Sequence, residues 1–453
     1  MELLDSRLWL LCCLVVPIFY HIYNKRKERQ ADKALGLQHG CLPPPRLENQ
    51  RPFGVDRLEQ IFRANKESRL KELFLFHSRQ TGHTLEQVFL GAPAFGTVDP
   101  ANIEAILSSN FKDGEAWKQS RELLRPQFHF KEYSDLNMFR DTTDNLLNAI
   151  AKEGVVDLQP LLFRLTLDMT TDFLFGESIR SLKVPESTGE QTFIEAFNIA
   201  QEYIAKRFHT CKKVHHFADT IINRNLSEDS LNGSGKYVFL RAMNKKTPDH
   251  TTACLLSWAF FLLVRHPNVL IKLRSEIAVY GNAELTRNDL RNMNYLQNIL
   301  KETLRLYPSV PVNTRTTLRT TILPTGGGPD RKSPVLVPKG TTVAYSVYTM
   351  HRRPDLYGMD AELFRLERWD EDMPLNHDKT NAKWGYLPFN GGPRICLGMD
   401  FALVEAAYTI VRIVQRFPII KLPKGEKVEL AGVEKQKITL VMSITEGCIV
   451  ELR

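Results

Sequence analysis

A single cysteine lies in a glycine-rich turn just before an apolar run near the C-terminus. The turn reads FNGGPRICLGMD over residues 389–400, with Cys396 between Arg394 and Gly398. A thiol at the start of a helix lies at the positive end of the helix dipole, which favours the thiolate. Glycines let backbone N–H groups approach the sulfur and leave room for a flat cofactor. Two chemistries use such a thiolate, namely nucleophilic catalysis and ligation of a haem iron.

The turn alone leaves three interpretations open. A nucleophilic cysteine needs a histidine partner, whose position in space the sequence does not give. An inert cysteine in the core is also compatible with these residues. The other cysteines form no C-x-x-C pair, which argues against a disulfide framework and a zinc cluster and favours a reducing compartment. They are Cys12, Cys13, Cys41, Cys211, Cys254 and Cys448.

The spacing around the cysteine favours haem ligation. The pattern F-x-x-G-x-R-x-C-x-G is present without a gap as Phe389, Gly392, Arg394, Cys396 and Gly398. It resembles the cysteine-ligand signature of the cytochrome P450 family, the haem-thiolate monooxygenases. The resemblance implies a mainly α fold with small β-sheets and haem b (iron protoporphyrin IX) as the cofactor. It also implies that Cys396 is the axial ligand of the iron and that Phe389 shields the sulfur side of the ring.

Three charged residues upstream match a second element of the same family. Glu302 and Arg305 match its E-x-x-R, and Arg368 in FRLERW matches the third member of that triad. Glu302 and Arg305 are one helical turn apart and therefore share a face. An isolated pair of this kind is usually a solvated surface bridge. The resemblance instead implies a buried network that fixes the segment carrying Cys396.

Four further residues resemble the family's propionate-binding set. Trp117 and Arg121 match W-x-x-x-R, and Arg315 in PVNTR lies where the family places another arginine. With Arg394, these arginines would offer planar donor forks to the haem propionates, and Trp117 would donate through its indole N–H. Without Cys396, the same residues would be interpreted as surface arginines and a core tryptophan.

The central segment departs from the family pattern. The family's A-G-x-D-T-T corresponds here to TPDHTT, in which Thr251 and Thr252 align with the threonines and His250 stands where the acid is expected. The resemblance implies that Thr251 is a catalytic residue that helps to deliver protons to bound oxygen. Pro248 fits only near a helix start. We therefore expect that the chain lacks a segment near 240–250, in the first half of the central helix. We expect a second missing segment near 113–115, where the family has the loop that covers the substrate pocket.

The N-terminus predicts a membrane anchor. Residues 8–23 are almost wholly apolar, and a basic cluster at residues 25–29 follows at once. Sixteen residues are short for a span of about 20, although a flank can extend it. A cleaved signal peptide is the alternative, but its positive charge would precede the apolar run. Residues 1–24 are therefore predicted to be a single-pass anchor in the endoplasmic reticulum, with the catalytic domain facing the cytosol.

Composition and periodicity predict the remaining organisation. Residues 25–46 form a basic, proline-rich linker, and 47–453 form the catalytic domain. Helices are expected over 285–308, with Thr286 as the cap, and over 401–417, and strands over 341–348 and 434–444. Loops are expected at 226–236 and 326–330. The net charge of +8 is dispersed, so it suits a membrane surface or an acidic partner and gives no argument for nucleic acid.

Finer resemblance points to a branch of the family. WGYLPFNGGPRICLG at 384–398, HRRPDLYG at 351–358 and the GGGPD loop are similar to the fungal alkane and fatty-acid hydroxylases. This similarity implies hydroxylation of a small hydrophobic substrate, an alkane, a fatty acid or a lipid-like secondary metabolite, with O₂ and electrons from NADPH-cytochrome P450 reductase. The alternative is a haem-binding remnant without turnover, because the segment 247–252 is altered.

The departures from the family pattern give a first testable prediction. If segments were lost through a mis-assigned intron, the transcript encodes additional residues near 113–115 and 240–250. Sequencing of the cDNA checks this directly. A cDNA that encodes the same uninterrupted 453 residues would refute mis-annotation as the cause.

Overall fold

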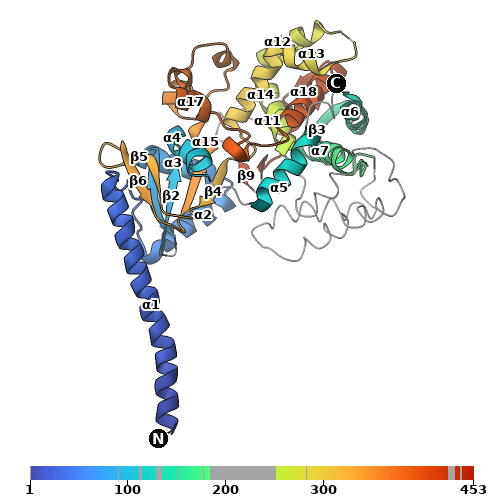
Figure 1. The fold of residues 1–453 in the computed structure, drawn as a ribbon. Helices are drawn as coiled ribbons and strands as arrows, with labels where there is room; N and C mark the ends of the chain where they lie inside the picture. Colours follow the sequence, from blue (N-terminus) through green and yellow to red (C-terminus); the bar gives the residue numbers. More distant parts are fainter. Residues whose placement is uncertain are drawn as a thin grey trace. The chain divides into compact units, whose positions relative to one another are not determined.

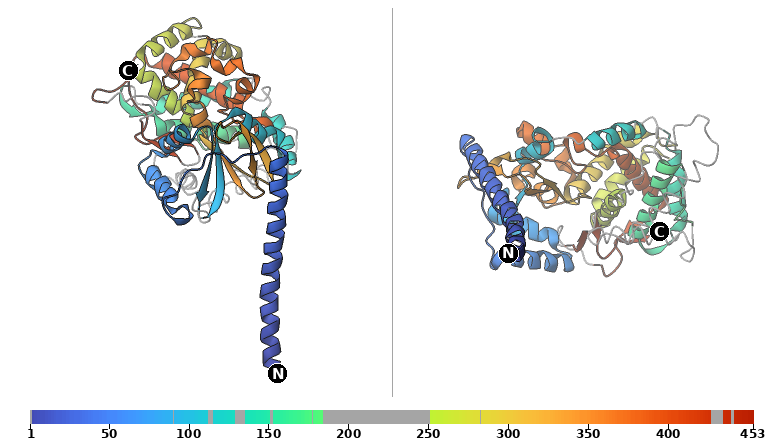
Figure 2. Two further views of the ribbon diagram at one scale, coloured as in Figure 1. Left: turned by 90° about the vertical axis from the view of Figure 1, so that its left-hand side faces the viewer. Right: turned by 60° about the horizontal axis from the view of Figure 1, so that its bottom comes forward.

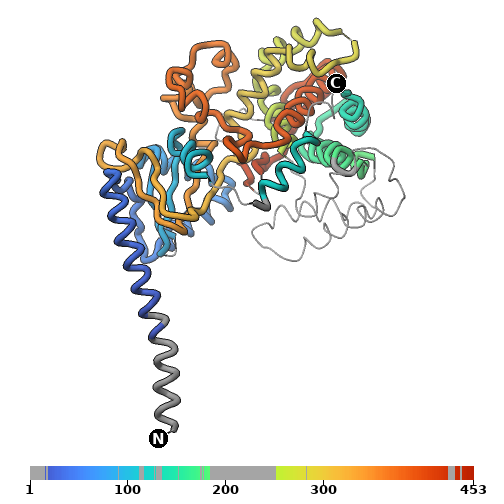
Figure 3. Tube along the Cα trace, in the orientation of Figure 1, coloured from blue at the N-terminus to red at the C-terminus, as the bar shows by residue number. Residues whose placement is uncertain are grey.

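The structure, a computed structural model, contains two compact units, each of which is described by itself. It describes residues 2–89, 91–111, 115–128, 135–150, 153–176, 178–183, 251–281, 283–426, 434–438 and 441–453 (Figure 3). The first unit comprises Met1–Leu58, Phe76–Asn110 and Thr314–Tyr345, and the second comprises Glu59–Leu75, Phe111–Asn313 and Ser346–Arg453. The predicted loop at 226–236 and the expected gap near 240–250 lie outside the described residues, and so do residues 113 and 114 of the expected gap near 113–115.

Helices predominate over short strands (Figure 1). The helices are α1 (Glu2–Gln38), α2 (Val55–Lys66), α3 (Leu70–Thr81), α4 (Pro100–Glu104), α5 (Glu115–Leu124), α6 (Asn137–Ala149), α7 (Leu158–Phe175), α11 (Thr251–Arg265), α12 (Pro267–Ala278), α13 (Arg287–Asn292), α14 (Asn294–Leu306), α15 (Val347–Met350), α16 (Pro354–Tyr357), α17 (Lys379–Trp384) and α18 (Met399–Arg416). The strands are β1 (Thr84–Phe89), β2 (Ala92–Thr97), β3 (Gly154–Asp157), β4 (Val312–Thr316), β5 (Thr321–Gly327), β6 (Ser333–Val337), β7 (Thr342–Ser346), β8 (Ile420–Lys421), β9 (Gln436–Ile438), β10 (Met442–Ile444) and β11 (Ile449–Leu452).

The first unit is built on a sheet with the strand order β1-β2-β7-β4. β1 and β2 form an antiparallel pair in which Thr84 lies opposite Thr97. β7 then adds in parallel to β2, with Ala94 opposite Thr342. Strands far apart in the sequence therefore lie side by side, as the blue and orange ribbons of Figure 2 show. β5 and β6 form a separate antiparallel hairpin.

The second unit is organised around α11. Its residues from Thr252 to Val264 are all buried, and α7, α14 and α18 pack against it (Figure 1). Because the helix is surrounded on all sides, its sequence is apolar all round rather than on one stripe. Trp258 at its centre stacks on Tyr307, with 3.9 Å between the ring centroids. The Trp258 indole N–H donates to the carbonyl of Met442 at 3.0 Å, so this large side chain is buried without an unmet donor.

Several predicted elements are confirmed and three differ, among them the loop expected at 326–330, whose first two residues belong to β5. Thr286 forms a capping box with Asp289, but the helix expected over 285–308 is divided into α13 and α14 by Met293, which has φ −74° and ψ 80°. α18 covers nearly all of the run expected to be helical, and β7 lies within 341–348. The single strand expected over 434–444 is instead an antiparallel pair, β9 and β10, in which each strand supplies partners for the backbone groups of the other.

The N-terminal helix extends further than the sequence predicted. α1 continues through residues 25–38, which were expected to belong to a linker, because the stretch is rich in good helix formers and contains no proline or glycine before Gly36. The prolines at 43–45 then exclude helix. Within the first unit, the Leu42 N–H donates to the carbonyl of Pro334 at 2.9 Å, so this stretch packs on a strand.

Among the residues that the structure describes, no single helix passes a length-and-hydropathy test for a membrane span; only the bent pair α11 and α12 passes it together.

A buried carboxyl in the helical core gives a prediction about pH and stability. Burial raises the pKa of Glu405 from 4.5 to about 8. Between these values the unfolded chain ionises this group while the folded protein keeps its proton. The free energy of unfolding should therefore fall as the pH rises from 4.5 to about 8, by roughly 1.4 kcal/mol at most for each unit of pKa shift.

The replacement Glu405→Gln should remove this slope, whereas the exposed control Glu67→Gln should keep it. Urea unfolding of the three proteins at pH 5, 6.5 and 8 measures the effect. Parallel pH profiles for the parent and Glu405→Gln would contradict the assignment.

Candidate active site

The cysteine turn is shaped by residues with left-handed backbone. Asn390 and Gly392 both have φ of +64°, a conformation that glycine adopts without steric cost and that asparagine tolerates. The turn is closed by a hydrogen bond from the Cys396 N–H to the carbonyl of Phe389 at 3.0 Å. α18 begins three residues later, at Met399. The thiol is thereby held just before the N-terminus of a long helix.

Exposure distinguishes this thiol from the other cysteines that the structure describes. Cys396 is exposed and Cys41 is half-buried, whereas Cys254 and Cys448 are buried. Burial raises the pKa of the Cys254 and Cys448 thiols well above the ordinary value, so both stay neutral and inert. Of these four cysteines, Cys396 has the environment that a ligand or nucleophile requires.

Two guanidinium groups gather on one indole beside the turn. The guanidinium carbon of Arg394 lies 4.1 Å from the Trp117 ring centroid, and that of Arg121 lies 5.6 Å from it. Arg121 Nη1 also donates to the carbonyl of Ile395 at 3.0 Å, the residue next to Cys396. Three of the four residues predicted to bind propionates therefore lie together at the cysteine turn.

The fourth predicted arginine lies in the first unit. Arg315 is on β4, where its Nη1 donates to the carbonyl of Thr314 at 2.7 Å and its guanidinium carbon lies 5.8 Å from the Tyr345 ring centroid. Its role at a propionate stays a prediction.

Glu302 is the centre of a fully buried ion network. Its side chain and those of Arg305 and Arg368 have no exposed surface. Glu302 Oε1 accepts from Arg305 Nη2 at 2.8 Å and from Arg368 Nε at 3.0 Å, while Oε2 accepts from Arg305 Nε at 2.8 Å. The Trp369 indole N–H and the Arg365 backbone N–H complete its coordination. One carboxylate thus holds two guanidinium groups and two neutral donors.

Both arginines also donate hydrogen bonds to backbone carbonyls. Arg305 donates to the carbonyls of His351, Ala361 and Leu363. Arg368 donates to the carbonyls of Tyr357 and Asp360. Because every one of these donors is charged, the bonds are stronger than neutral ones. The network therefore fixes the chain between residues 351 and 368 against α14.

His351 is a positioning residue that the sequence analysis missed. Its Nε2 accepts from the Leu387 N–H at 2.9 Å, and its Nδ1 lies 3.1 Å from the carbonyl of Arg305. This arrangement requires a neutral ring with the proton on Nδ1, and burial lowers the pKa of His351 to about 3. The ring thus connects the buried network to the residue that lies two positions before Phe389.

The threonines of the central segment lie at the start of α11. Thr251 is partly buried, and its carbonyl accepts from Ser309 Oγ at 3.0 Å. Thr252 is buried and its hydroxyl hydrogen-bonds the Glu405 carboxyl. Glu405 is a second residue that the sequence analysis missed, because nothing in the apolar stripe of α18 marks it as a partner of α11. The predicted role of Thr251 in proton delivery stays a prediction.

Comparisons with known proteins identify the family. The family model described as cytochrome P450 matches residues 100–231 and 249–441. A cytochrome P450 of Arthroderma benhamiae is 41% identical, with 98% of this chain and 98% of the relative covered. Cytochrome P450 52A12 of Debaryomyces hansenii is 36% identical over 90% of this chain and 92% of the relative. Cytochrome P450 52A6 of Candida tropicalis is 35% identical over 100% and 99%.

Solved structures agree on the fold. The chain resembles the crystal structure of the cytochrome P450DA heme domain with a TM-score of 0.72, covering 91% of this chain and 98% of that one, at 19% sequence identity. The chain therefore belongs to the cytochrome P450 family and has its mainly helical fold with small sheets. It is a monooxygenase of the haem-dependent class, and the predicted family, fold and enzyme class are confirmed.

The comparisons also bear on the altered central segment. The alignment with the Arthroderma protein is 497 positions long, more than the 453 residues of this chain, so the relative carries residues that this chain lacks. The family model leaves residues 232–248 unmatched. That this chain has lost segments near 113–115 and 240–250 stays a prediction that the transcript tests.

The described residues fit haem b, the cofactor of the family. The exposed Cys396 thiol offers a soft axial ligand for iron. Arg121 and Arg394 place positive charge beside it, where the acidic propionates of a porphyrin would be neutralised. Opposite the turn, a methyl group built on Gly398 would approach the Phe128 ring to 3.3 Å, so a larger residue there would crowd the space next to the cysteine.

The Glu302 network generates a prediction about stability and haem binding. Glu302→Gln keeps the shape of the side chain but removes the charge that neutralises two buried guanidinium groups. The free energy of unfolding should fall by about 3–5 kcal/mol, and haem binding should weaken because the cysteine turn loses its support. Denaturant unfolding and hemin titration measure the two effects.

Glu367→Gln is the matched control, because Glu367 is half-exposed. Its ion-pair partner among the described residues is the exposed Lys272. A Glu302→Gln protein with parental stability and haem affinity would show that the network does not support the turn.

Proposed function

We propose that this enzyme hydroxylates an aliphatic substrate, an alkane, a fatty acid or a lipid-like metabolite, with Cys396 as the thiolate ligand of the haem iron. The observation that carries the proposal is the exposed Cys396 thiol at the start of α18, next to Arg121 and Arg394. The substrate class rests on the similarity of residues 351–358 and 384–398 to fungal alkane and fatty-acid hydroxylases.

Each predicted site residue has a separate role in the proposed reaction. When bound, haem supplies oxygen activation and the insertion of one oxygen atom into a C–H bond. Cys396 would donate electron density to the iron from its thiolate, and the Trp117, Arg121 and Arg394 cluster would hold the propionates. Phe389, which is partly buried and packs on the main core, shields the sulfur. Thr251 would hold a proton at its hydroxyl for delivery, and Glu302, Arg305 and Arg368 keep the turn in place.

The electron source and the location extend the proposal. Electrons would come from NADPH through the membrane-bound NADPH-cytochrome P450 reductase, an acidic-partner interaction that the net charge of +8 suits. The first 24 residues would anchor the chain in the endoplasmic reticulum membrane, with the catalytic domain on the cytosolic side. This arrangement brings the site close to a membrane in which hydrophobic substrates dissolve.

The ligand assignment predicts the behaviour of two variants. Cys396→Ser should abolish the thiolate band in the absorption spectrum of the reduced, carbon monoxide-bound protein, because a serine oxygen does not reproduce the thiolate. Cys41→Ser, which changes a half-buried thiol in the first unit, should leave the band intact. An unchanged spectrum in Cys396→Ser would overturn the assignment.

Thr251→Ala should keep the spectrum but lower the coupling of NADPH oxidation to product by about 100-fold, the lower end of the range for loss of proton-transfer catalysis. Product and peroxide are measured with reductase and a panel of fatty acids and alkanes. Absence of product across the panel in the parent protein would favour a haem-binding remnant without turnover.

A further inference from the structure

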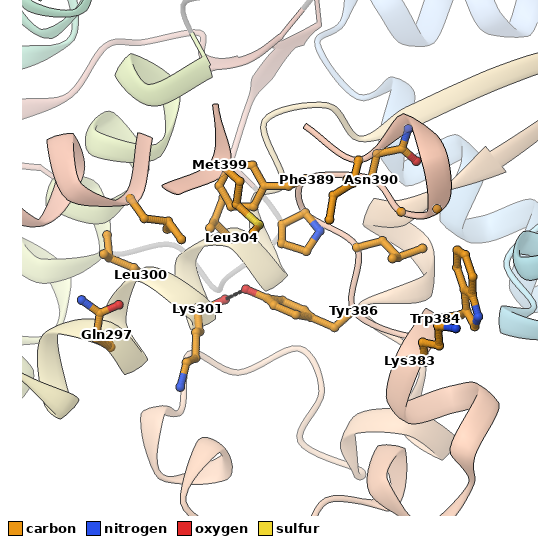
Figure 4. A pocket seen from close by; sticks show the side chains of 16 residues that line it. Gln297, Leu300, Lys301, Leu304, Lys383, Trp384, Tyr386, Phe389, Asn390 and Met399 are labelled. Atoms are coloured by element: carbon orange, nitrogen blue, oxygen red, sulfur yellow. Dashed lines mark hydrogen bonds between the residues drawn. The ribbon is translucent and has the colours of Figure 1, made fainter. Parts of the chain in front are cut away.

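A cavity of about 440 Å³ lies behind the cysteine turn, between α14, α17 and the start of α18 (Figure 4). Its volume lies in the range of small-molecule sites. The apolar part of the wall is formed by Leu300, Leu304, Phe389, Met399 and Leu403. Leu300 and Leu304 belong to α14, while Met399 and Leu403 belong to α18. We call the part of the cavity between these side chains the apolar lobe.

Of the second-unit residues that are predicted to bind haem, the cavity shares only Phe389. Neither Cys396 nor Arg394 lines it, and the Trp117 and Arg121 side chains do not line it either. The wall is instead the opposite side of the same turn, because Gly391, Gly392 and Ile395 contribute to it. A molecule inside the cavity would therefore press on the turn without touching the sulfur.

The polar groups at the cavity favour an anion. Lys301 and Lys383 line it, and no aspartate or glutamate is among the described lining residues. In Figure 4 both lysines lie along the lower edge, with Tyr386 between them. Lys301 donates to the neutral Asn298 Oδ1 at 3.3 Å, and Lys383 lies 5.5 Å from the Trp384 ring centroid. Neither contact is with a carboxylate, so no lining residue neutralises the positive charges of Lys301 and Lys383.

Trp384 gives an independent indication of a ligand. Its side chain lines the cavity and is only 2% exposed. Its indole nitrogen has no hydrogen-bond acceptor among the described residues. A buried donor without a partner is costly and rare in folded proteins. A carboxylate bound between Lys383 and this N–H would supply the missing acceptor and neutralise the ammonium group.

We propose that this cavity is a binding site for a free fatty acid, with the carboxylate at Lys383 and the Trp384 N–H and the alkyl chain along Leu300, Leu304 and Met399. A cavity of about 440 Å³ has room for one alkyl chain rather than for the two chains and head group of a phospholipid, which favours a free fatty acid. No residue of α11, which carries Thr251, lines the cavity, so the site is separate from a substrate position that Thr251 would serve. An occupant would stabilise the turn between Phe389 and Ile395 and thereby the position of Cys396.

Photoaffinity mapping of the holoenzyme tests this site without requiring turnover. The probe is dodecanoic acid carrying a diazirine on its chain, and its methyl ester is the neutral counterpart. An azole that ligates the haem iron is added first, so that the substrate position is blocked. The acid should label the peptides that contain Leu300–Leu304 and Met399–Leu403, and it should label them at least fivefold more than the ester does.

Two variants test separately the positive charge at the cavity and the space inside it. Lys383→Ala should reduce labelling by the acid about fivefold, the scale of one exposed ion pair, and leave labelling by the ester unchanged. Lys379→Ala is the matched control, because Lys379 is an exposed lysine on the same short helix that does not line the cavity. Met399→Trp, which fills the lobe, should reduce labelling by both probes, with haem content and thermal unfolding as checks on folding.

Each outcome decides the proposal. Equal labelling by acid and ester, labelling only at other peptides, or labelling that survives Met399→Trp in a folded holoenzyme would overturn it. Labelling of these peptides by a diazirine phospholipid in vesicles, but not by the acid, would assign the cavity to a membrane lipid instead. Hydroxylation assays of the same preparations show separately whether the enzyme turns over, so failure of the cavity site and failure of the proposed function remain distinguishable.

Discussion

The Glu302 carboxylate accepts hydrogen bonds from two arginines while it is completely removed from water. A charge in such a position is tolerated only when its partners are present and correctly placed, because loss of one partner leaves an uncompensated buried ion. Arg305 comes from the same helix, but Arg368 comes from a segment more than 60 residues away. The ion network can therefore form only when α14 and the 351–368 segment are packed together. This requirement selects one arrangement of the second unit.

The constraint is transmitted from the network to the cysteine turn through neutral hydrogen bonds. His351 joins the carbonyl of Arg305 to the Leu387 N–H, and the Tyr357 hydroxyl donates to the carbonyl of Gly385 at 2.9 Å. Both side chains are buried, so water does not compete for these bonds. The chain that leads into Phe389 thereby has a fixed path, and the two left-handed residues of the turn then present Cys396 outward.

Sequence predicted the parts of the site that depend on local spacing. Glu302 and Arg305 are three residues apart on one helix, and Cys396 follows a turn with glycines at fixed positions, so both features are visible in the one-dimensional pattern. Thr286 was recognisable as a cap for the same reason. His351 and Glu405 were not predictable in this way, because their partners are a backbone group of Leu387 and the hydroxyl of Thr252. Such pairings exist only after distant helices pack. The continuation of α1 beyond residue 24 was not predicted, because the prolines at 43–45 indicate an extended linker and follow closely on the helix-forming residues 25–38.

In the proposed site, the Cys396 sulfur would bind the iron of a haem whose propionates would be held by Trp117, Arg121 and Arg394. X-ray absorption at the iron edge of the purified, haem-loaded protein measures the coordination of the metal directly. The account predicts one sulfur atom in the first coordination shell of the parent protein and none in Cys396→Ser. A first shell made only of nitrogen and oxygen in the parent protein would contradict it.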